Sequence, residues 1–191
     1  MTGMEAERGY GRRGSGGQSG PAVVVMGVAG CGKSLVGAAL AKAIGARFIE
    51  GDALQPSENV ARMSRGEPLT DTLRAGWLDA VGQSIRAAML GGEGAVAACS
   101  ALKRIYRDRL RRCEPSVVFV YLVVTPREAR RRVTGRRGHF MPASLVDSQF
   151  ATLEPPGADE AALSVGAERP LDEIVAAVVE FLALRRSQLS Q

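Results

Sequence analysis

The sequence predicts an α/β fold in which a central parallel β-sheet carries helices on both faces. Strand-like and helix-like segments alternate along the chain after residue 20, as in folds built from repeated strand–helix units. The eight residues from Val117 to Val124 are all apolar, which is typical of a parallel strand covered on both faces. With 191 residues, 46% of them hydrophobic, the chain suits one domain with a full core.

The predicted domain begins after a polar N-terminal segment. Residues 1–20 are rich in glycine, serine and arginine, with Tyr10 as their only aromatic residue. This composition predicts a disordered tail, and the domain is expected to span residues 21–191. Its first strand is the apolar, β-branched run 22–26. The first helix is expected over 35–44 and ends at Gly45, a residue suited to a helix C-terminus.

A glycine-rich loop joins this strand to this helix and matches G-x-x-x-x-G-K-[ST], the phosphate-binding P-loop. Its glycines let successive N–H groups point at phosphate oxygens, and the following helix adds the positive end of its dipole. The lysine reaches the β- and γ-phosphates, and the serine reaches Mg²⁺. The residues expected to bind ATP are Gly27, Val28, Ala29, Gly30, Cys31, Gly32, Lys33 and Ser34. The alternative is a glycine turn that matches by coincidence.

The next elements continue the alternation. A short strand is predicted over 47–50, a helix over 57–63 with Ser57 as its N-cap, and a long helix over 71–90. In the long helix an apolar residue recurs every four positions, which predicts a core-facing stripe that includes Trp77. A third strand is expected over 95–99, followed by an amphipathic helix over 103–113.

The C-terminal half contains the apolar strand 117–124 and four further elements. Pro126 suits the first position of a helix, which is expected to run to about Thr134. A glycine-flanked basic loop over 135–140 precedes a helix over 142–152, a weak last strand over 161–165 and a closing helix over 171–184.

Candidate chemistry follows the strands, because ligands bind beyond the carboxyl ends of parallel strands. Glu50 and Asp52 follow the second strand, where carboxylates can hold Mg²⁺ through water and accept a hydroxyl proton. Turn capping is the alternative reading. Lys103 and Arg107 lie one helical turn apart after the third strand and could clamp an anion. The alternative there is a solvated basic helix.

The arginines 130–132 and 136–137 surround Gly135 and Gly138, a pattern that suggests a basic lid. A lid excludes water that would otherwise hydrolyse ATP, and it can deliver an arginine to the transferring group. The alternative is a flexible solvated loop. His139, the only histidine of the chain, is expected to contact substrate rather than to act as a base.

Charge and cysteines narrow the class of protein. The net charge is +5, but the segment 103–137 alone carries +9. Such a basic segment can bind nucleic acid or equally a small anionic substrate together with nucleotide phosphates. It has few aromatic residues for base stacking, and many of its arginines are expected to solvate helix faces. Cys31, Cys99 and Cys113 show neither metal-ligand nor disulfide spacing. No apolar run approaches a membrane span, and a cytoplasmic location is expected.

Six ordered blocks resemble the gluconokinase family of thermoresistant type, and they span residues 22–185. The blocks are M-G-V-A-G-C-G-K-S (26–34), G-D-A-L-Q-P-S-E-N-V-A-R-M (51–63), G-E-P-L-T-D (66–71), C-S-A-L-K-R-I-Y-R-D-R-L-R (99–111), R-R-G-H-F (136–140) and S-Q-F-A-T-L-E-P-P (148–156). The resemblance implies a P-loop kinase fold. It also implies Mg²⁺- and ATP-dependent phosphorylation of D-gluconate at its 6-hydroxyl to give 6-phosphogluconate and ADP, and a homodimer that binds neither nucleic acid nor membrane.

The resemblance also implies roles for single residues. Asp52 would orient and deprotonate the acceptor hydroxyl, Lys33 would serve catalysis, and Glu50 would reach Mg²⁺ through water. Arg132 and Arg136 would be lid arginines, with Arg132 also on ATP, and the adenine would meet the loop before Pro170. The residues expected near gluconate are Asp52, Arg62, Lys103, Arg107, His139 and Gln149.

The chain departs from the family pattern on the acceptor side. Gln55 stands where histidine is usual, Arg62 where lysine is common, Thr72–Leu73 where acidic residues are usual, and Gly76 where proline is usual. The alternatives are therefore a kinase for another small anionic acceptor, such as a related sugar acid or shikimate, and a nucleotide-dependent regulatory protein without kinase activity.

Overall fold

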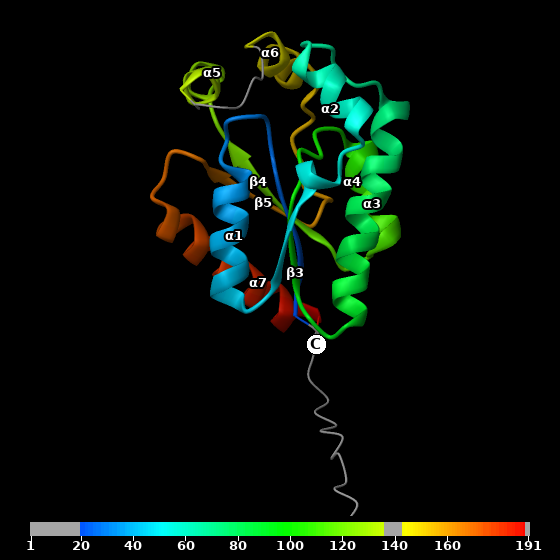
Figure 1. Cartoon of the computed structure of the whole chain (residues 1–191). Coiled ribbons are helices and arrows are strands. Elements are labelled where there is room, and N and C mark those ends of the chain that lie inside the picture. Colours follow the sequence, from blue (N-terminus) through cyan, green and yellow to red (C-terminus); the bar gives the residue numbers. More distant parts are fainter. Residues whose placement is uncertain (1–19, 136–142, 190–191) are drawn as a thin grey trace, which may run out of the picture.

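The computed structural model describes residues 20–135 and 143–189 and contains one five-stranded parallel sheet. The strand order is β2-β3-β1-β4-β5 (Figure 1). The strands are β1 (Ala22–Met26), β2 (Arg47–Glu50), β3 (Ala95–Ala98), β4 (Val118–Val123) and β5 (Ala162–Gly166). The predicted α/β class and the parallel sheet are confirmed. The apolar strand β4 lies between β1 and β5, and β1 occupies the middle of the sheet.

Helices cover both faces of the sheet. They are α1 (Lys33–Ile44), the 3₁₀ helix η1 (Gly51–Leu54), α2 (Ser57–Ser64), α3 (Asp71–Leu90), α4 (Arg104–Cys113), α5 (Pro126–Thr134), α6 (Ala143–Thr152) and α7 (Leu171–Leu189). Helices α1 and α7 lie on one face and α3 and α4 on the other, while α2, α5 and α6 gather beyond one end of the strands (Figure 1).

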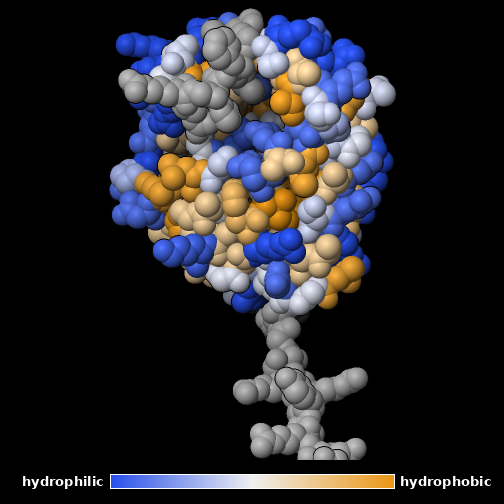
Figure 2. Space-filling view, viewed as in Figure 1, coloured by the Kyte–Doolittle hydropathy of each residue, from blue (hydrophilic) through white to orange (hydrophobic). Residues whose placement is uncertain are grey.

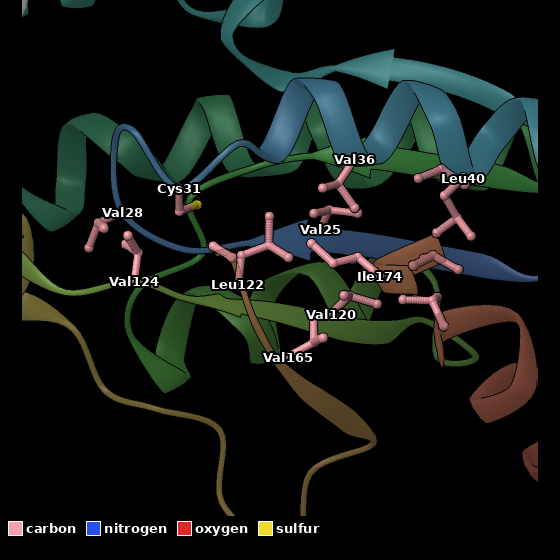
Figure 3. Packing of buried hydrophobic residues seen from close by; sticks show 14 of the residues in the cluster. Val25, Val28, Cys31, Val36, Leu40, Val120, Leu122, Val124, Val165 and Ile174 are labelled. Carbon is pink, nitrogen blue, oxygen red and sulfur yellow. The ribbon is translucent and has the colours of Figure 1, made fainter. Parts of the chain in front are cut away.

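Alternate residues of β1 supply the two halves of the core. Val23 and Val25 pack with Val36 and Leu40 of α1 and with Ile174 of α7 (Figure 3). The residues between them, among them Val24 and Met26, pack against α3 and α4 instead. Because successive side chains of a strand point to opposite faces, this division explains why β1 is apolar throughout.

The local signals for several helix ends are confirmed. Gly45 ends α1 with φ of 65°, a left-handed conformation that favours glycine. Pro126 begins α5, where the Thr125 hydroxyl accepts a hydrogen bond from the Glu128 N–H. The N-cap predicted for α2 is wrong, because Pro56 occupies the cap position, Ser57 is the first helical residue, and no side chain caps this end.

The proposed boundary of the domain falls at the edge of the described residues. The expected tail lies outside them apart from Gly20, whose backbone lies against Gly94 so closely that an added Cβ would meet the Gly94 Cα at 2.7 Å. Within residues 20–135 and 143–189, no helix is both long and apolar enough to cross a membrane.

Candidate active site

The glycine loop joins β1 to α1 at the carboxyl end of the sheet. The Gly27 N–H donates to the Ser100 carbonyl at 3.2 Å, which ties the loop to the end of β3. Gly30, with φ of 81°, backs onto α5, and a Cβ there would meet the Ala129 carbonyl oxygen at 2.6 Å. The loop therefore needs glycine at this position both for its backbone conformation and for its contact with α5.

Lys33 and Ser34 begin α1, where the sequence predicts them to meet nucleotide phosphates. The Lys33 ammonium donates to the carbonyl of Val28 in its own loop at 3.1 Å. The Ser34 side chain is partly exposed and, within the described part of the chain, its hydroxyl has no hydrogen-bond partner. A hydroxyl that is free at this place suits a Mg²⁺ ligand that works together with phosphate oxygens and water.

A side chain from α6 touches the same loop. The Ala29 N–H donates to Gln149 Oε1 at 2.7 Å, across 120 positions of the sequence. The carbonyl oxygen of the amide thus pairs with one of the backbone donors of the P-loop. Gln149, which the sequence analysis places near the acceptor, contacts the donor side of the site.

The thiol of Cys31 is buried under the loop. It lies 2.9 Å from the position that a Cβ on Gly27 would occupy, and only 1% of the residue is exposed. Burial raises the pKa of this thiol, while the charges of Lys33 and Arg132 oppose the increase. The residue therefore packs in the core, and its position at a helix N-terminus does not make it a reactive thiolate.

The acidic turn after β2 is held in place by its backbone. Trp77 Nε1 donates to the Gly51 carbonyl at 2.7 Å, and a Cβ on Gly51 would lie 2.3 Å from the Ala98 carbonyl oxygen of β3. This packing leaves the next residue, Asp52, exposed. The stripe on α3 predicts Trp77 as a core residue, and the structure adds that its indole N–H positions the turn.

The P-loop and the acidic turn meet at the carboxyl end of β3. The Gly27 N–H donates to the Ser100 carbonyl just beyond the strand, and Gly51 packs against the carbonyl of Ala98, its last residue. Cys99 lies between these two contacts, and burial raises the pKa of its thiol to about 12. Within the described ranges, no group of three or more His, Cys, Asp or Glu residues could hold a metal by itself.

The N-termini of α3 and α4 form a polar cluster. Lys103 Nζ donates to both carboxylate oxygens of Asp71, at 2.8 and 2.9 Å, and the Tyr106 hydroxyl donates to the same carboxylate. These hydrogen bonds, that of Lys103 above all, lower the pKa of Asp71. The guanidinium of Arg74 lies 5.8 Å from the centre of the Tyr106 ring. Asp71, Arg74 and Tyr106 are not among the site residues expected from the sequence.

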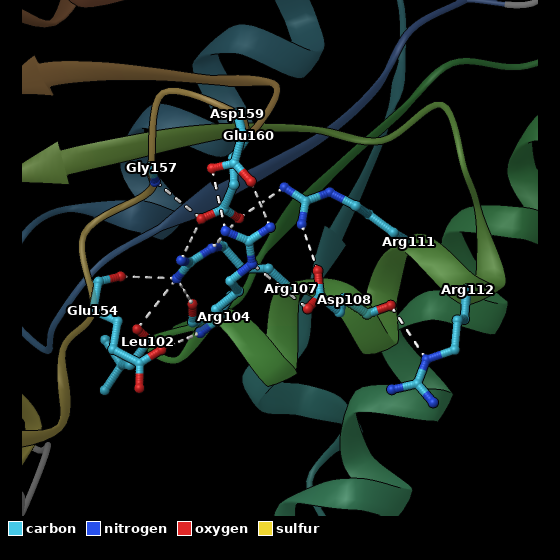
Figure 4. A network of polar contacts seen from close by, with 11 residues as sticks. Leu102, Arg104, Arg107, Asp108, Arg111, Arg112, Glu154, Gly157, Asp159 and Glu160 are labelled. Carbon is cyan, nitrogen blue, oxygen red and sulfur yellow. Dashed lines mark hydrogen bonds and ion pairs between the residues drawn. The ribbon is translucent and has the colours of Figure 1, made fainter.

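Arg107 occupies a different environment from the one predicted. Its side chain is 1% exposed and forms a bidentate ion pair with Glu160, at 2.6 and 2.7 Å (Figure 4). It also donates to the carbonyls of Ala101, Leu102 and Glu154. The expectation that Arg107 clamps substrate together with Lys103 does not fit this arrangement, because the guanidinium is enclosed by protein acceptors.

Arg62, on α2, is partly free to meet a ligand. Its terminal nitrogens approach Glu58 at 3.0 Å and Glu67 at 3.7 Å. Its Nε is buried and has no hydrogen-bond partner among residues 20–135 and 143–189. Nearby, the buried Asn59 ties α2 to α3 through its hydrogen bond to the Leu73 carbonyl, and the unusual Gln55 accepts a second hydrogen bond from the same amide.

Arg132 lies where α5, the P-loop and the segment before Pro170 meet. It donates to Glu128 at 2.7 Å and to the Ala167 carbonyl at 3.1 Å, and hydrogen bonds from Arg131 and Arg132 lower the pKa of Glu128 to about 2. A pocket beside this segment is lined by Val123, Val124, Thr125, Gly166 and Glu168. Another pocket, at the amino end of β2, lies away from all of these groups.

Two predicted site residues, Arg136 and His139, lie outside the described residues. On the face shown in Figure 2, hydrophilic residues lie around the edge of the molecule and hydrophobic residues form a band across its middle.

Comparisons with known proteins agree with this geometry. A family model described as AAA domain matches residues 23–156. A gluconokinase of Gluconobacter oxydans (strain 621H) is 48% identical over 153 residues, which cover 80% of this chain and 86% of that protein. The thermoresistant gluconokinase of Escherichia coli (strain K12) is 39% identical over 160 residues, which cover 83% of this chain and 91% of that protein.

A solved structure gives the same answer for the fold. The crystal structure of a gluconokinase from Sinorhizobium meliloti 1021 superimposes with a TM-score of 0.81 at 44% identity, and the match covers 91% of this chain and 97% of that one. The residues matched by the family model, 23–156, include the P-loop and the acidic turn after β2. The chain belongs to the gluconokinase family of P-loop kinases.

Proposed function

We propose that this protein transfers the γ-phosphoryl group of ATP to the 6-hydroxyl of D-gluconate, with 6-phosphogluconate and ADP as products. The observation that carries the proposal is that the P-loop and the acidic turn both contact the carboxyl end of β3, where Gly27 donates to the Ser100 carbonyl and Gly51 packs against the Ala98 carbonyl. A phosphate-binding cation from the loop and an exposed carboxylate from the turn are what phosphoryl transfer to a hydroxyl requires.

On the donor side, the loop N–H groups and Lys33 bind the β- and γ-phosphates, and their fixed positive charge stabilises the charge that develops on the transferred group. Arg132 supplies a further cation once it leaves Glu128. The adenine lies near the pocket formed by β4, β5 and the segment before Pro170. Mg²⁺, when bound, would neutralise part of the phosphate charge. Ser34 would hold it directly, and Glu50 would hold it through water.

On the acceptor side, Asp52 orients the hydroxyl and accepts its proton. Lys103 and Arg62 provide positive charge for the carboxylate of gluconate. The buried, unpartnered Nε of Arg62 supports this role, because a buried donor without a partner is costly until an acceptor reaches it. His139 and Arg136 are further proposed members of the site.

A panel of acceptors tests the proposal. ADP release is measured by a coupled assay with D-gluconate, related sugar acids, shikimate and a nucleoside monophosphate, and without acceptor. We expect turnover that requires an acceptor and is fastest with D-gluconate, and ³¹P NMR should place the phosphate on carbon 6. Preferential turnover of shikimate or of a nucleoside monophosphate would overturn the choice of acceptor. ATP turnover that is independent of every acceptor would favour a regulatory nucleotide-binding protein.

The proposal also includes several properties that rest on the family resemblance. They are Mg²⁺ dependence, a cytoplasmic location, a homodimeric assembly and the absence of nucleic-acid and membrane binding. In the same assay, chelation by EDTA should abolish turnover and added Mg²⁺ should restore it. Light scattering of the purified protein should give twice the monomer mass. Binding to DNA or RNA at physiological salt would contradict the small-molecule function.

A further inference from the structure

Arg107 joins the β3–α4 connection to the segment between α6 and β5, about 50 positions away in the sequence. From α4 it donates to Ala101 and Leu102 in the β3–α4 connection, at 3.2 and 3.3 Å, and to the Glu154 carbonyl at 2.9 Å. Its ion pair with Glu160 reaches the start of β5 (Figure 4). Arg111 donates to the same Glu160 carboxylate at 2.8 Å.

The first of these segments leads directly to Lys103. Ala101 has φ of 43° and is the only non-glycine residue with positive φ among the described residues. A left-handed conformation at alanine is strained and persists only where the surroundings hold it. The hydrogen bond from Arg107 to the Ala101 carbonyl is one contact that holds it, and the backbone two residues later carries the Lys103 ammonium.

The second segment leads back to the P-loop. The Glu154 N–H donates to the Leu102 carbonyl at 2.9 Å, and the Arg104 N–H, in the first turn of α4, donates to Glu154 Oε2 at 2.7 Å. Glu154 lies two residues after α6 ends. Since α6 carries Gln149, whose amide oxygen pairs with the Ala29 N–H, the contacts around Arg107 link Lys103 on the acceptor side to Gln149 on the donor side.

A buried ion pair of this kind is weak evidence for a purely stabilising role. Both side chains of the Arg107–Glu160 pair are 1% exposed, and the cost of removing two charges from water offsets most of their attraction. A pair of apolar residues would fill the same space at least as stably. What an apolar pair could not do is bind three separate backbone carbonyls in a fixed geometry.

We infer that Arg107 is a positioning residue for phosphoryl transfer, which sets Lys103 and Gln149 in register across the site without touching either substrate. The inference rests on the proposed function for the identity of the acceptor. The sequence predicts that Arg107 binds an anionic substrate, whereas in the structure the anion that it binds is the Glu160 carboxylate.

The variant Arg107→Lys tests this inference, with Arg109→Lys as a matched control. Arg109 lies on the same helix and forms a bidentate pair of the same kind with Asp79, at 2.6 Å for both contacts, but that pair faces α3 and is about one third exposed. Lysine keeps the charge at position 107 but cannot reach Glu160 and three carbonyls together. We expect the KM for gluconate to rise and kcat to fall, each on the order of tenfold, whereas Arg109→Lys leaves both within about twofold.

A double-mutant cycle separates positioning from simple destabilisation. If Arg107 acts through Lys103, the variant Arg107→Lys adds little to the KM defect of Lys103→Met, although it lowers the thermal midpoint equally in both backgrounds. If Arg107→Lys fails to fold, Glu154→Ala provides the second test, because it removes the bond to Arg104 and leaves the buried pair intact. It should raise the gluconate KM in the same direction.

Three outcomes decide the matter. Unchanged KM and kcat in both Arg107→Lys and Glu154→Ala would overturn the inference. Multiplicative defects in the cycle with Lys103→Met would also overturn it, by showing that the two residues act independently. A wild-type protein that fails to phosphorylate gluconate would refute the proposed function instead. In that event the KM and kcat of Arg107→Lys are measured with the acceptor that the protein does phosphorylate. The Kd of a fluorescent ATP analogue is measured as well, and Arg107→Lys should raise it because Gln149 contacts the P-loop.

Discussion

The variant Trp77→Phe tests whether the position of Asp52 depends on one hydrogen bond from α3. The indole Nε1 donates to the Gly51 carbonyl at 2.7 Å, and Trp77 is 2% exposed. Phenylalanine cannot donate, so the buried carbonyl loses its partner, which costs about 1–3 kcal/mol. The smaller ring leaves a cavity that adds roughly 1 kcal/mol. We therefore expect the free energy of unfolding to fall by about 2–4 kcal/mol.

Activity should fall as well, for a separate reason. Gly51 is pressed against β3 and its neighbour Asp52 is the proposed base, so a turn freed from the indole holds the carboxylate less firmly. We expect this loss of positioning to lower kcat by about tenfold. Unfolding in urea, followed by far-UV circular dichroism because Trp77 is the only tryptophan, gives the stability, and the coupled ADP assay gives kcat.

A control on the same helix distinguishes the two effects. Ile85 lies on the same buried stripe, and Ile85→Val should cost about 1 kcal/mol of stability with kcat unchanged at a temperature where both proteins are folded. If Trp77→Phe loses the expected stability but keeps kcat, the indole does not position Asp52. A loss of stability below about 0.5 kcal/mol would show that the hydrogen bond to Gly51 contributes little.

Three further predictions follow from the site and its ion pairs. Lys33→Met should abolish turnover and leave the circular dichroism spectrum unchanged, and near-normal activity would contradict the P-loop assignment. Asp52→Asn should lower kcat at least 100-fold with little change in the Kd for ATP, and an unchanged kcat would exclude Asp52 as the base. Hydrogen bonds from Arg107 hold the pKa of Glu160 at about 2 against an ordinary 4.5. The folded state therefore binds fewer protons than the unfolded state in this window, and stability should fall as the pH drops from about 4.5 towards 2. When the free energy of unfolding is measured by urea titration at several pH values, Glu160→Gln should lose this part of the pH dependence. An unchanged pH dependence would refute the role of Glu160.

The fold was predictable because its signals are local. The bounds of β1, β2, α3 and α5 agree with the predicted ranges to the residue, since apolar runs, a regular stripe and an N-terminal proline define them. The N-cap of α2 was not predictable in this way, because a proline before the serine competes for the cap position.

The candidate site was only partly predictable, because its arginines look alike in the sequence. Lys103 and Arg107 lie one turn apart, and nothing local distinguishes an arginine that faces a ligand from one that faces Glu160, 53 positions away. Asp71 was missed for a similar reason: its partner Lys103 is 32 positions away. The buried tryptophan carried a usable signal, because an indole N–H in a core needs an acceptor.

The buried cysteine of the P-loop allows the opening of this loop to be measured by thiol labelling. Cys31 and Cys99 are both 1% exposed, and burial raises the pKa of both thiols, so a maleimide or a disulfide reagent reaches neither in the closed structure. Cys113 is the more accessible thiol and can be replaced by serine. Alkylation of Cys31 then requires the loop to open locally. We expect bound ATP to stabilise the loop, so that the labelling half-time at Cys31 lengthens with nucleotide occupancy, without an acceptor and without turnover.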